Sequence, residues 1–160
     1  MNNQFDELIK QYWVQYMHGY DWRIGWGQIM QESSFDTLAI SPVGAEGLCQ
    51  FMPGTWRDAI AAGIVLPGTP RTDAVASIKA GAWYMGKMVK FWTTPRDKDN
   101  LIKWALASYN YGAGNVLKAQ KAAGGSLIFE DLLPHLPTET AEYPYRIRQH
   151  VIGEFGITLF

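Results

Sequence analysis

Apolar side chains recur at helical spacing along most of this 160-residue chain, and glycine or proline breaks the spacing at short intervals. Between residues 5 and 17 they stand three or four positions apart, so they would form one stripe along a helix. The same reading predicts helices over about 5–17, 21–32, 53–63, 72–91, 98–109, 114–123 and 139–152. We therefore expect a mostly α fold.

One stretch, residues 36–50, does not fit a helix. Ser41-Pro42, Gly44 and Gly47 fall within seven positions there. Each of these residues favours a turn or a loop over the interior of a helix. The stretch therefore predicts a loop or a small β-hairpin, which would be the minor β element of the fold.

Local signals also suggest where the helices start and where they break. Asp21 and Thr55 precede or open apolar patterns and are candidate N-caps. Gly81 and Gly86 lie inside the helix predicted over 72–91. Since glycine is a poor helix former, we expect both to interrupt this helix.

The composition is that of one packed globular domain. Hydrophobic residues make up 48% of the chain and charged residues 18%. No repeat, low-complexity tract or linker divides it, so we expect a single domain over residues 1–160. The net charge of −1 argues against nucleic acid as a partner, and no apolar run reaches the ~20 residues of a membrane span. Some of the 7 Trp and 8 Tyr are candidates for lining a binding groove, and the others for the core.

Cysteine and histidine give no sign of a metal site. Cys49 is the only cysteine, which rules out an intramolecular disulfide and a multi-cysteine zinc site. His18, His135 and His150 show no helix-spaced pairing with one another or with an acid. No metal is therefore expected.

Glu32 stands at the end of the second predicted helix, directly before the loop segment. Its helix is largely apolar, with Trp26, Ile29 and Met30 close by in sequence. An apolar setting disfavours the ionised carboxylate and raises its pKa, as a general acid working near neutral pH requires. Glu32 is therefore a candidate general acid at the edge of a groove.

Four motifs are spread over residues 31–147. They are Glu32-Ser33; Ser41-Pro42-Val43-Gly44-Ala45 with Gly47-Leu48-Cys49-Gln50; Ser108-Tyr109-Asn110 before Gly112; and Glu139-Thr140 followed by Tyr143. Together they resemble the motifs of the lytic transglycosylases related to goose-type lysozyme, the SLT-domain proteins. The chain departs from the family pattern at Cys49, Ser108 and Pro144, where methionine, alanine and valine are usual. Residue type, order and spacing agree together, so the resemblance does not depend on one short match.

The resemblance implies a lysozyme-like single domain with at most a small β-hairpin or loop near the active site. It implies cleavage of the β-1,4 bond between N-acetylmuramic acid and N-acetylglucosamine in peptidoglycan, with formation of 1,6-anhydromuramic acid ends. Glu32 would act as acid and then as base, Tyr143 would orient it, and no cofactor is implied. The substrate-binding residues would be Ser41, Gln50, Tyr109 and Asn110.

Two other functions stay open from the sequence. A muramidase on the same fold would use water and usually a second carboxyl group. Among Asp36, Glu46, Glu139 and Glu142, the candidate we favour is Glu46, because it lies in the loop segment beside the expected groove. A catalytically inactive wall-binding module of a larger assembly is the more distant alternative.

The first residues, 1–13, contain no basic stretch followed by an apolar core, so no secretory signal is expected. For a wall-degrading enzyme this suggests a bacteriophage protein, made in the host cytoplasm and acting on the cell-wall peptidoglycan. It would reach the wall as a virion component, beside other virion proteins, or as an endolysin through a holin. A secretion-machinery enzyme, or a chain trimmed of its signal, would look the same.

Overall fold

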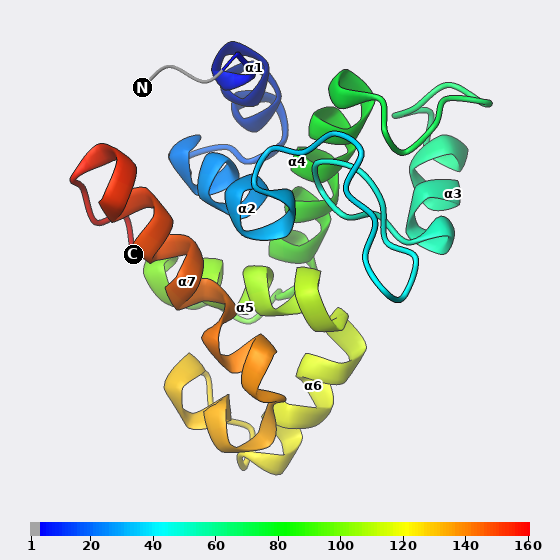
Figure 1. The fold of residues 1–160 in the computed structure, drawn as a ribbon. Coiled ribbons are helices and arrows are strands. Elements are labelled where there is room, and N and C mark those ends of the chain that lie inside the picture. Colours follow the sequence, from blue (N-terminus) through cyan, green and yellow to red (C-terminus); the bar gives the residue numbers. More distant parts are fainter. Residues whose placement is uncertain (1–3) are drawn as a thin grey trace.

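The computed structural model describes residues 4–160, and helices make up nearly all of its regular structure (Figure 1). In this range the helices are α1 (Asp6–Tyr16), α2 (Arg23–Ser33), α3 (Pro53–Ala61), α4 (Ala74–Phe91), α5 (Lys98–Tyr111), α6 (Ala113–Ala122), the 3-10 helix η1 (Phe129–His135) and α7 (Thr138–Phe155). Across the same residues, β pairing is limited to isolated bridges from Glu46 to Ile40 and to Phe51. The mostly α prediction, with a minor β element in the loop segment, is confirmed.

Helices far apart in the sequence pack side by side. α2 lies against α7, while α4 lies between α1 and α5 and contacts both. Figure 1 shows α6 and the orange η1 segment together at one end of the molecule, and α3 on the far side of α4. The segment over residues 34–52, which we call the wall loop, joins α2 to α3 and is drawn in cyan.

Three clusters of buried side chains hold these elements together. One joins α1, α4, α5 and α7 around Met85. A second joins α1, α2 and α4 to the wall loop through Leu48 and Phe51. The third joins α5, α6 and η1 around Trp104 and Phe129. The wall loop is thus anchored in the core, which fixes the position of its polar side chains.

The expected interruption of α4 at Gly81 and Gly86 is wrong, because the helix runs through both. A Cβ atom at Gly81 would lie 2.6 Å from the Cys49 sulfur, and one at Gly86 would lie 2.6 Å from the Tyr16 carbonyl oxygen. Tertiary packing outweighs the helix-propensity cost of about 1 kcal/mol per glycine. The two glycines let the wall loop and α1 approach α4 closely.

The two capping predictions have different outcomes. Asp21 lies one position before the N-cap of α2, so the predicted position is off by one residue. Its carboxylate nevertheless accepts a hydrogen bond from the amide of Arg23, the first residue of the helix, at 2.9 Å. α3 begins instead at Pro53, whose fixed φ suits the first helical position. The capping prediction for Thr55 is therefore wrong.

Two further differences lie in the second half of the chain. α5 extends two residues beyond the predicted 98–109, to Tyr111, and Gly112 follows as its C-cap with a φ of 87°. η1 was not predicted, because its seven residues include Pro134 and are too short for a helical period to stand out.

Candidate active site

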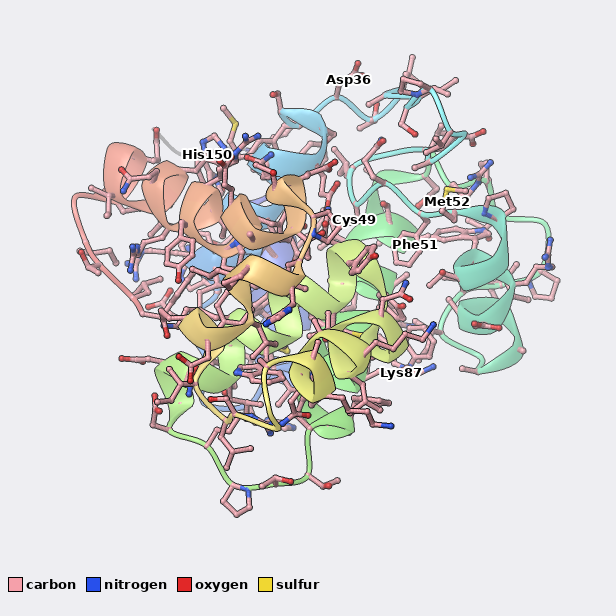
Figure 2. All side chains as sticks on the ribbon, turned by 90° about the horizontal axis from the view of Figure 1, so that it is seen from below. Asp36, Cys49, Phe51, Met52, Lys87 and His150 are labelled. Atoms are coloured by element: carbon pink, nitrogen blue, oxygen red, sulfur yellow. The ribbon has the colours of Figure 1, made fainter. Side chains whose placement is uncertain are left out.

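An open groove of about 260 Å³ lies where the C-terminal end of α2, the wall loop, α5 and the first turn of α7 meet. Phe51 and Met52 mark its wall-loop side in Figure 2. Its lining residues are Glu32, Ser41, Val43, Ala45, Gln50, Phe51, Met52, Thr55, Tyr84, Tyr109, Asn110 and Glu139. The aromatic lining is phenylalanine and tyrosine rather than tryptophan, and five of the seven tryptophans are buried in the core.

Glu32 lies in the last turn of α2 and is partly buried at the groove. The pKa of this carboxyl is raised from 4.5 to about 7. Burial is the largest cause, the hydrogen bond from Tyr143 opposes the rise, and the negative charge of Glu139 adds to it. At neutral pH both the protonated and the ionised forms are therefore well populated. Such a group can donate a proton in one step and accept one in the next.

Tyr143 lies behind Glu32 rather than in the groove. Its side chain is 2% exposed, and its hydroxyl donates a hydrogen bond to Glu32 Oε1. Burial and the nearby Glu32 carboxylate keep the pKa of this phenol well above 10.0, so it remains a donor. Pro144, the next residue, is the seventh of α7; it removes one backbone donor, yet Tyr143 still reaches Glu32.

Ser41 and Gln50 present polar atoms from the wall loop. Ser41 Oγ accepts a hydrogen bond from the Ala45 amide at 3.0 Å, so its own hydrogen is available to a ligand. Gln50 has a φ of 50°, and its Nε2 donates to the carbonyl oxygens of Ala39 at 3.2 Å and Gly47 at 2.9 Å. The Gln50 amide nitrogen therefore stabilises the wall loop, while the Gln50 side-chain carbonyl oxygen is available to accept a hydrogen bond from a ligand.

Tyr109 and Asn110 come from the last turn of α5. The Tyr109 hydroxyl donates to the Cys49 carbonyl oxygen at 2.8 Å, so the ring, rather than the hydroxyl hydrogen, is offered to the groove. Asn110 Oδ1 accepts from the Thr140 hydroxyl at 2.8 Å, while its Nδ2 lies 3.4 Å from Glu139 Oε1. These bonds turn the Asn110 amide nitrogen toward the groove as a donor.

The second carboxyl group of the groove is Glu139, not Glu46. Glu46 is bound to Arg71 at 2.7 Å and does not line the groove. Glu139 is exposed in the first turn of α7 and does line it. The preference for Glu46 as a second acid is therefore wrong, because a cation 25 positions along the chain neutralises it.

Residues 15–131 match the family model for the transglycosylase SLT domain, which is well over half of the chain. The chain belongs to this family. The matched range of the SLT domain includes Glu32, the wall loop and α5, whereas α7 with Tyr143 lies beyond it.

Relatives of this SLT domain include membrane-bound lytic murein transglycosylases F. The protein from Desulfosudis oleivorans is 38% identical over 106 residues, which is 66% of this chain and 22% of that protein. The protein from Salmonella typhi is 34% identical over 129 residues, which is 78% of this chain and 26% of that protein. The SLT domain thus spans about a quarter of the length of these relatives.

Solved structures with the same fold come from soluble lytic transglycosylases. The 70 kDa enzyme of Escherichia coli is 24% identical, with a TM-score of 0.69 over 89% of this chain and 23% of that one. A complex of the 70-kDa soluble lytic transglycosylase with bulgecin A is 23% identical, with a TM-score of 0.79 over 98% of this chain and 26% of that one. These likenesses confirm the lysozyme-like fold of the SLT domain.

Two residues support the site in ways that the sequence analysis did not predict. Ser33 Oγ lies 2.9 Å from the Leu48 carbonyl oxygen, so it ties the end of α2 to the wall loop. Arg71 donates to the carbonyl oxygens of Gly44 and Phe51, each at 2.7 Å. Ser33 follows Glu32 in the first motif, which was a usable signal; Arg71 sits in a proline- and glycine-containing loop with no pattern to mark it.

Other kinds of site find little support in the described part of the chain. Residues 4–160 contain no group of three His, Cys, Asp or Glu placed to hold a metal ion. Over the same residues, no helix is long and apolar enough to cross a membrane. Burial raises the pKa of the Cys49 thiol to about 12, so this cysteine is not a ready nucleophile.

Proposed function

We propose that this SLT domain is a peptidoglycan lytic transglycosylase that uses one carboxyl group as acid and then as base. The bond cleaved is the β-1,4 bond between N-acetylmuramic acid and N-acetylglucosamine, and the product carries a 1,6-anhydromuramic acid end. The main support is Glu32, a groove carboxyl with a pKa of about 7 that is held by a buried tyrosine. Family membership and the names of the relatives agree with this activity.

In the first step, protonated Glu32 gives its proton to the glycosidic oxygen, and the bond from that oxygen to C1 of the muramyl sugar breaks. The N-acetylglucosamine side leaves with a free hydroxyl group, while positive charge develops at C1. In the second step, the C6 hydroxyl of the same muramyl sugar attacks C1 and passes its proton to ionised Glu32. Glu32 ends protonated, no water is consumed, and one groove carboxyl is enough.

The other groove residues would bind the sugars. The Ser41 hydroxyl and the Asn110 amide nitrogen supply donors, and the Gln50 carbonyl oxygen supplies an acceptor. The rings of Tyr84 and Tyr109 give flat apolar surface against which a sugar face can pack. Tyr143 would keep Glu32 oriented without touching the substrate.

The test is mass spectrometry of the muropeptides that the purified protein releases from peptidoglycan, with Glu32→Gln alongside. Products with 1,6-anhydromuramic acid ends, one water lighter than reducing ends and absent with the variant, are expected. If no product depends on Glu32, the proposed activity is refuted and the wall-binding module is favoured.

Hydrolysis is the second candidate, because Glu139 places another carboxyl group in the groove. Reducing ends that disappear in Glu139→Gln as well as in Glu32→Gln would establish a muramidase and refute the transglycosylase. Anhydro ends that persist in Glu139→Gln would support the single-carboxyl mechanism.

The bacteriophage origin, with a virion or a holin as the route to the wall, stays a prediction from the sequence. Expression of the chain in a bacterial cytoplasm, with and without a co-expressed holin, tests the endolysin route. Lysis that requires the holin is expected, and lysis without it would contradict that route.

A further inference from the structure

Gln28 is a buried polar residue that the reaction described above does not use. It lies on α2 one helical turn before Glu32, and it is 5% exposed. Its Nε2 donates a hydrogen bond to the Tyr143 hydroxyl oxygen at 3.3 Å. Gln28 does not line the groove, so it cannot touch a bound sugar.

The hydrogen bonds run in one direction, from Gln28 to Tyr143 and on to Glu32. A phenol has a single hydrogen, and Tyr143 gives it to Glu32 Oε1. The Tyr143 oxygen therefore faces Gln28 as an acceptor, and only the NH2 end of the Gln28 amide can match it. In both of these bonds a donor meets an acceptor.

If the hydrogen bond between Tyr143 and Glu32 ran in the opposite direction, the proton of the acid would lie on the oxygen that faces Tyr143. Protonated Glu32 could donate from Oε1 to the Tyr143 oxygen, and its proton would then point away from the groove. With the Gln28 amide also donating to the Tyr143 oxygen, both neighbours of this hydroxyl would be donors, and neither would accept the Tyr143 hydrogen. The proton of the acid then has to sit on Oε2, the carboxyl oxygen that is not bonded to Tyr143.

We propose that Gln28 is a positioning residue that fixes the direction of the Tyr143–Glu32 hydrogen bond and so keeps the acid's proton on the oxygen available to substrate. The inference rests on the proposed function, because it assigns a role only if Glu32 is the acid. Gln28 itself is neutral, so its effect is separate from that of the charged neighbours of Glu32.

Four titratable groups act on or lie near Glu32, and the variant at Gln28 must not alter them. Glu139 and Tyr143 come from α7, Tyr109 from α5, and the Cys49 thiol from the wall loop. Glu139 is the one that carries a charge at neutral pH. A variant at Gln28 leaves all four in place.

The first variant is Gln28→Met, which removes the amide while keeping a side chain of similar length. Without the Gln28 bond, Tyr143 is a weaker donor to Glu32, so the pKa of Glu32 should rise by roughly half a unit. The kcat should fall by roughly three- to tenfold with KM unchanged, because the groove lining is untouched. The pKa is read from a 13C NMR titration of the Glu32 carboxyl in the free protein, assigned with Glu32→Gln.

Ile29→Val is the matched packing control. Ile29 is the next residue on α2, is 4% exposed and has no polar side-chain atom. This variant should lower stability slightly without moving the Glu32 titration or kcat. An equal shift of that titration in Ile29→Val would show a packing effect and overturn the proposal.

A double-mutant cycle with Tyr143→Phe decides whether Gln28 acts through Tyr143. The effect of Gln28→Met on the Glu32 titration should vanish in the Tyr143→Phe background; if it persists, or if Gln28→Met alone has no effect, the proposal is overturned. This readout does not need activity, whereas the muropeptide analysis of the unaltered protein tests the proposed function by itself.

Discussion

At the scale of single residues, Glu139 is the charged neighbour that acts on Glu32 across the groove. Its negative charge adds to burial in raising the pKa of Glu32. A general acid must be protonated to act, so activity should fall as the pH rises through the folded-state pKa of about 7. The position of this alkaline limb therefore depends on burial first and, in part, on the charge at Glu139.

Replacing Glu139 by glutamine should lower the pKa of Glu32, because the like charge is gone while burial and the Tyr143 bond remain. The alkaline limb of kcat/KM should move to lower pH, measured with solubilised glycan strands. Glu142→Gln is the control: Glu142 is paired with Arg146 on the exposed side of α7 and does not line the groove. An alkaline limb that stays in place in Glu139→Gln would contradict the electrostatic role.

The sequence predicted which residues come together at the site, but it did not predict which of two acids, Glu46 or Glu139, lies there with Glu32. Glu32, Ser41, Gln50, Tyr109 and Asn110 line one groove, with Tyr143 bonded to Glu32; their roles stay predictions until activity is measured. Glu46 and Glu139 could not be ranked from the sequence, since the ranking depends on where Arg71 lies in space.

At the scale of elements, α4 illustrates what hydrophobic periodicity can and cannot predict. The apolar spacing predicted a helix over 72–91, close to the observed Ala74–Phe91. It could not predict that two glycines are needed inside the helix, because that depends on which segments pack against it. The Gly86 position is limited by the backbone of α1, which has little freedom to move.

Gly86→Ala should destabilise the protein by about 1–3 kcal/mol, because its Cβ would lie 2.6 Å from the Tyr16 carbonyl oxygen. Gly153→Ala on α7 is the matched control, since no heavy atom lies within 4 Å of its Cβ. There the better helix propensity of alanine should stabilise by up to about 1 kcal/mol. Urea denaturation measures both, and equal effects of the same sign would contradict the packing argument.

The position of the wall loop depends on tertiary contacts made by Arg71, just as the packing around α4 depends on its two glycines. Arg71→Met removes the bonds to Gly44, Phe51 and Glu46 while keeping much of the side-chain stem. We expect faster hydrogen exchange in residues 44–51 and a KM raised by about tenfold, since charged hydrogen bonds to the loop are lost.

Arg146→Met is the control for this variant. The Arg146–Glu142 pair is exposed, with side-chain exposures of 53% and 49%, and such pairs contribute little. Exchange in the wall loop and KM should stay unchanged. If Arg71→Met behaves like Arg146→Met, Arg71 does not hold the loop.

At the scale of the whole molecule, the raised pKa of Glu32 also lowers the free energy of unfolding at neutral and higher pH. The folded state binds the Glu32 proton more tightly than the unfolded chain, whose value is near 4.5. Stability is therefore highest below pH 4.5 with respect to this group, and it is lost as the pH rises through about 7. The shift corresponds to a loss on the order of 3 kcal/mol above pH 7.

Glu32→Gln should consequently be more stable than the unaltered protein at pH 8, by an amount that shrinks toward zero near pH 4. Urea denaturation at a series of pH values measures the difference. A difference that does not depend on pH would show that Glu32 titrates normally in the folded state. The single domain over residues 1–160 stays a prediction, and one two-state transition in the same experiment would support it.

The packing of α2 against α7 has a consequence for how the protein is made. Glu32 and its hydrogen-bond partner Tyr143 lie 111 residues apart in the chain, and a ribosome releases the N-terminal part first. A growing chain thus carries the carboxyl group long before the tyrosine that is bonded to it in the folded protein has emerged. The pair forms only once α7 has emerged, so a nascent chain that stops short of α7 carries Glu32 without its hydrogen-bond partner.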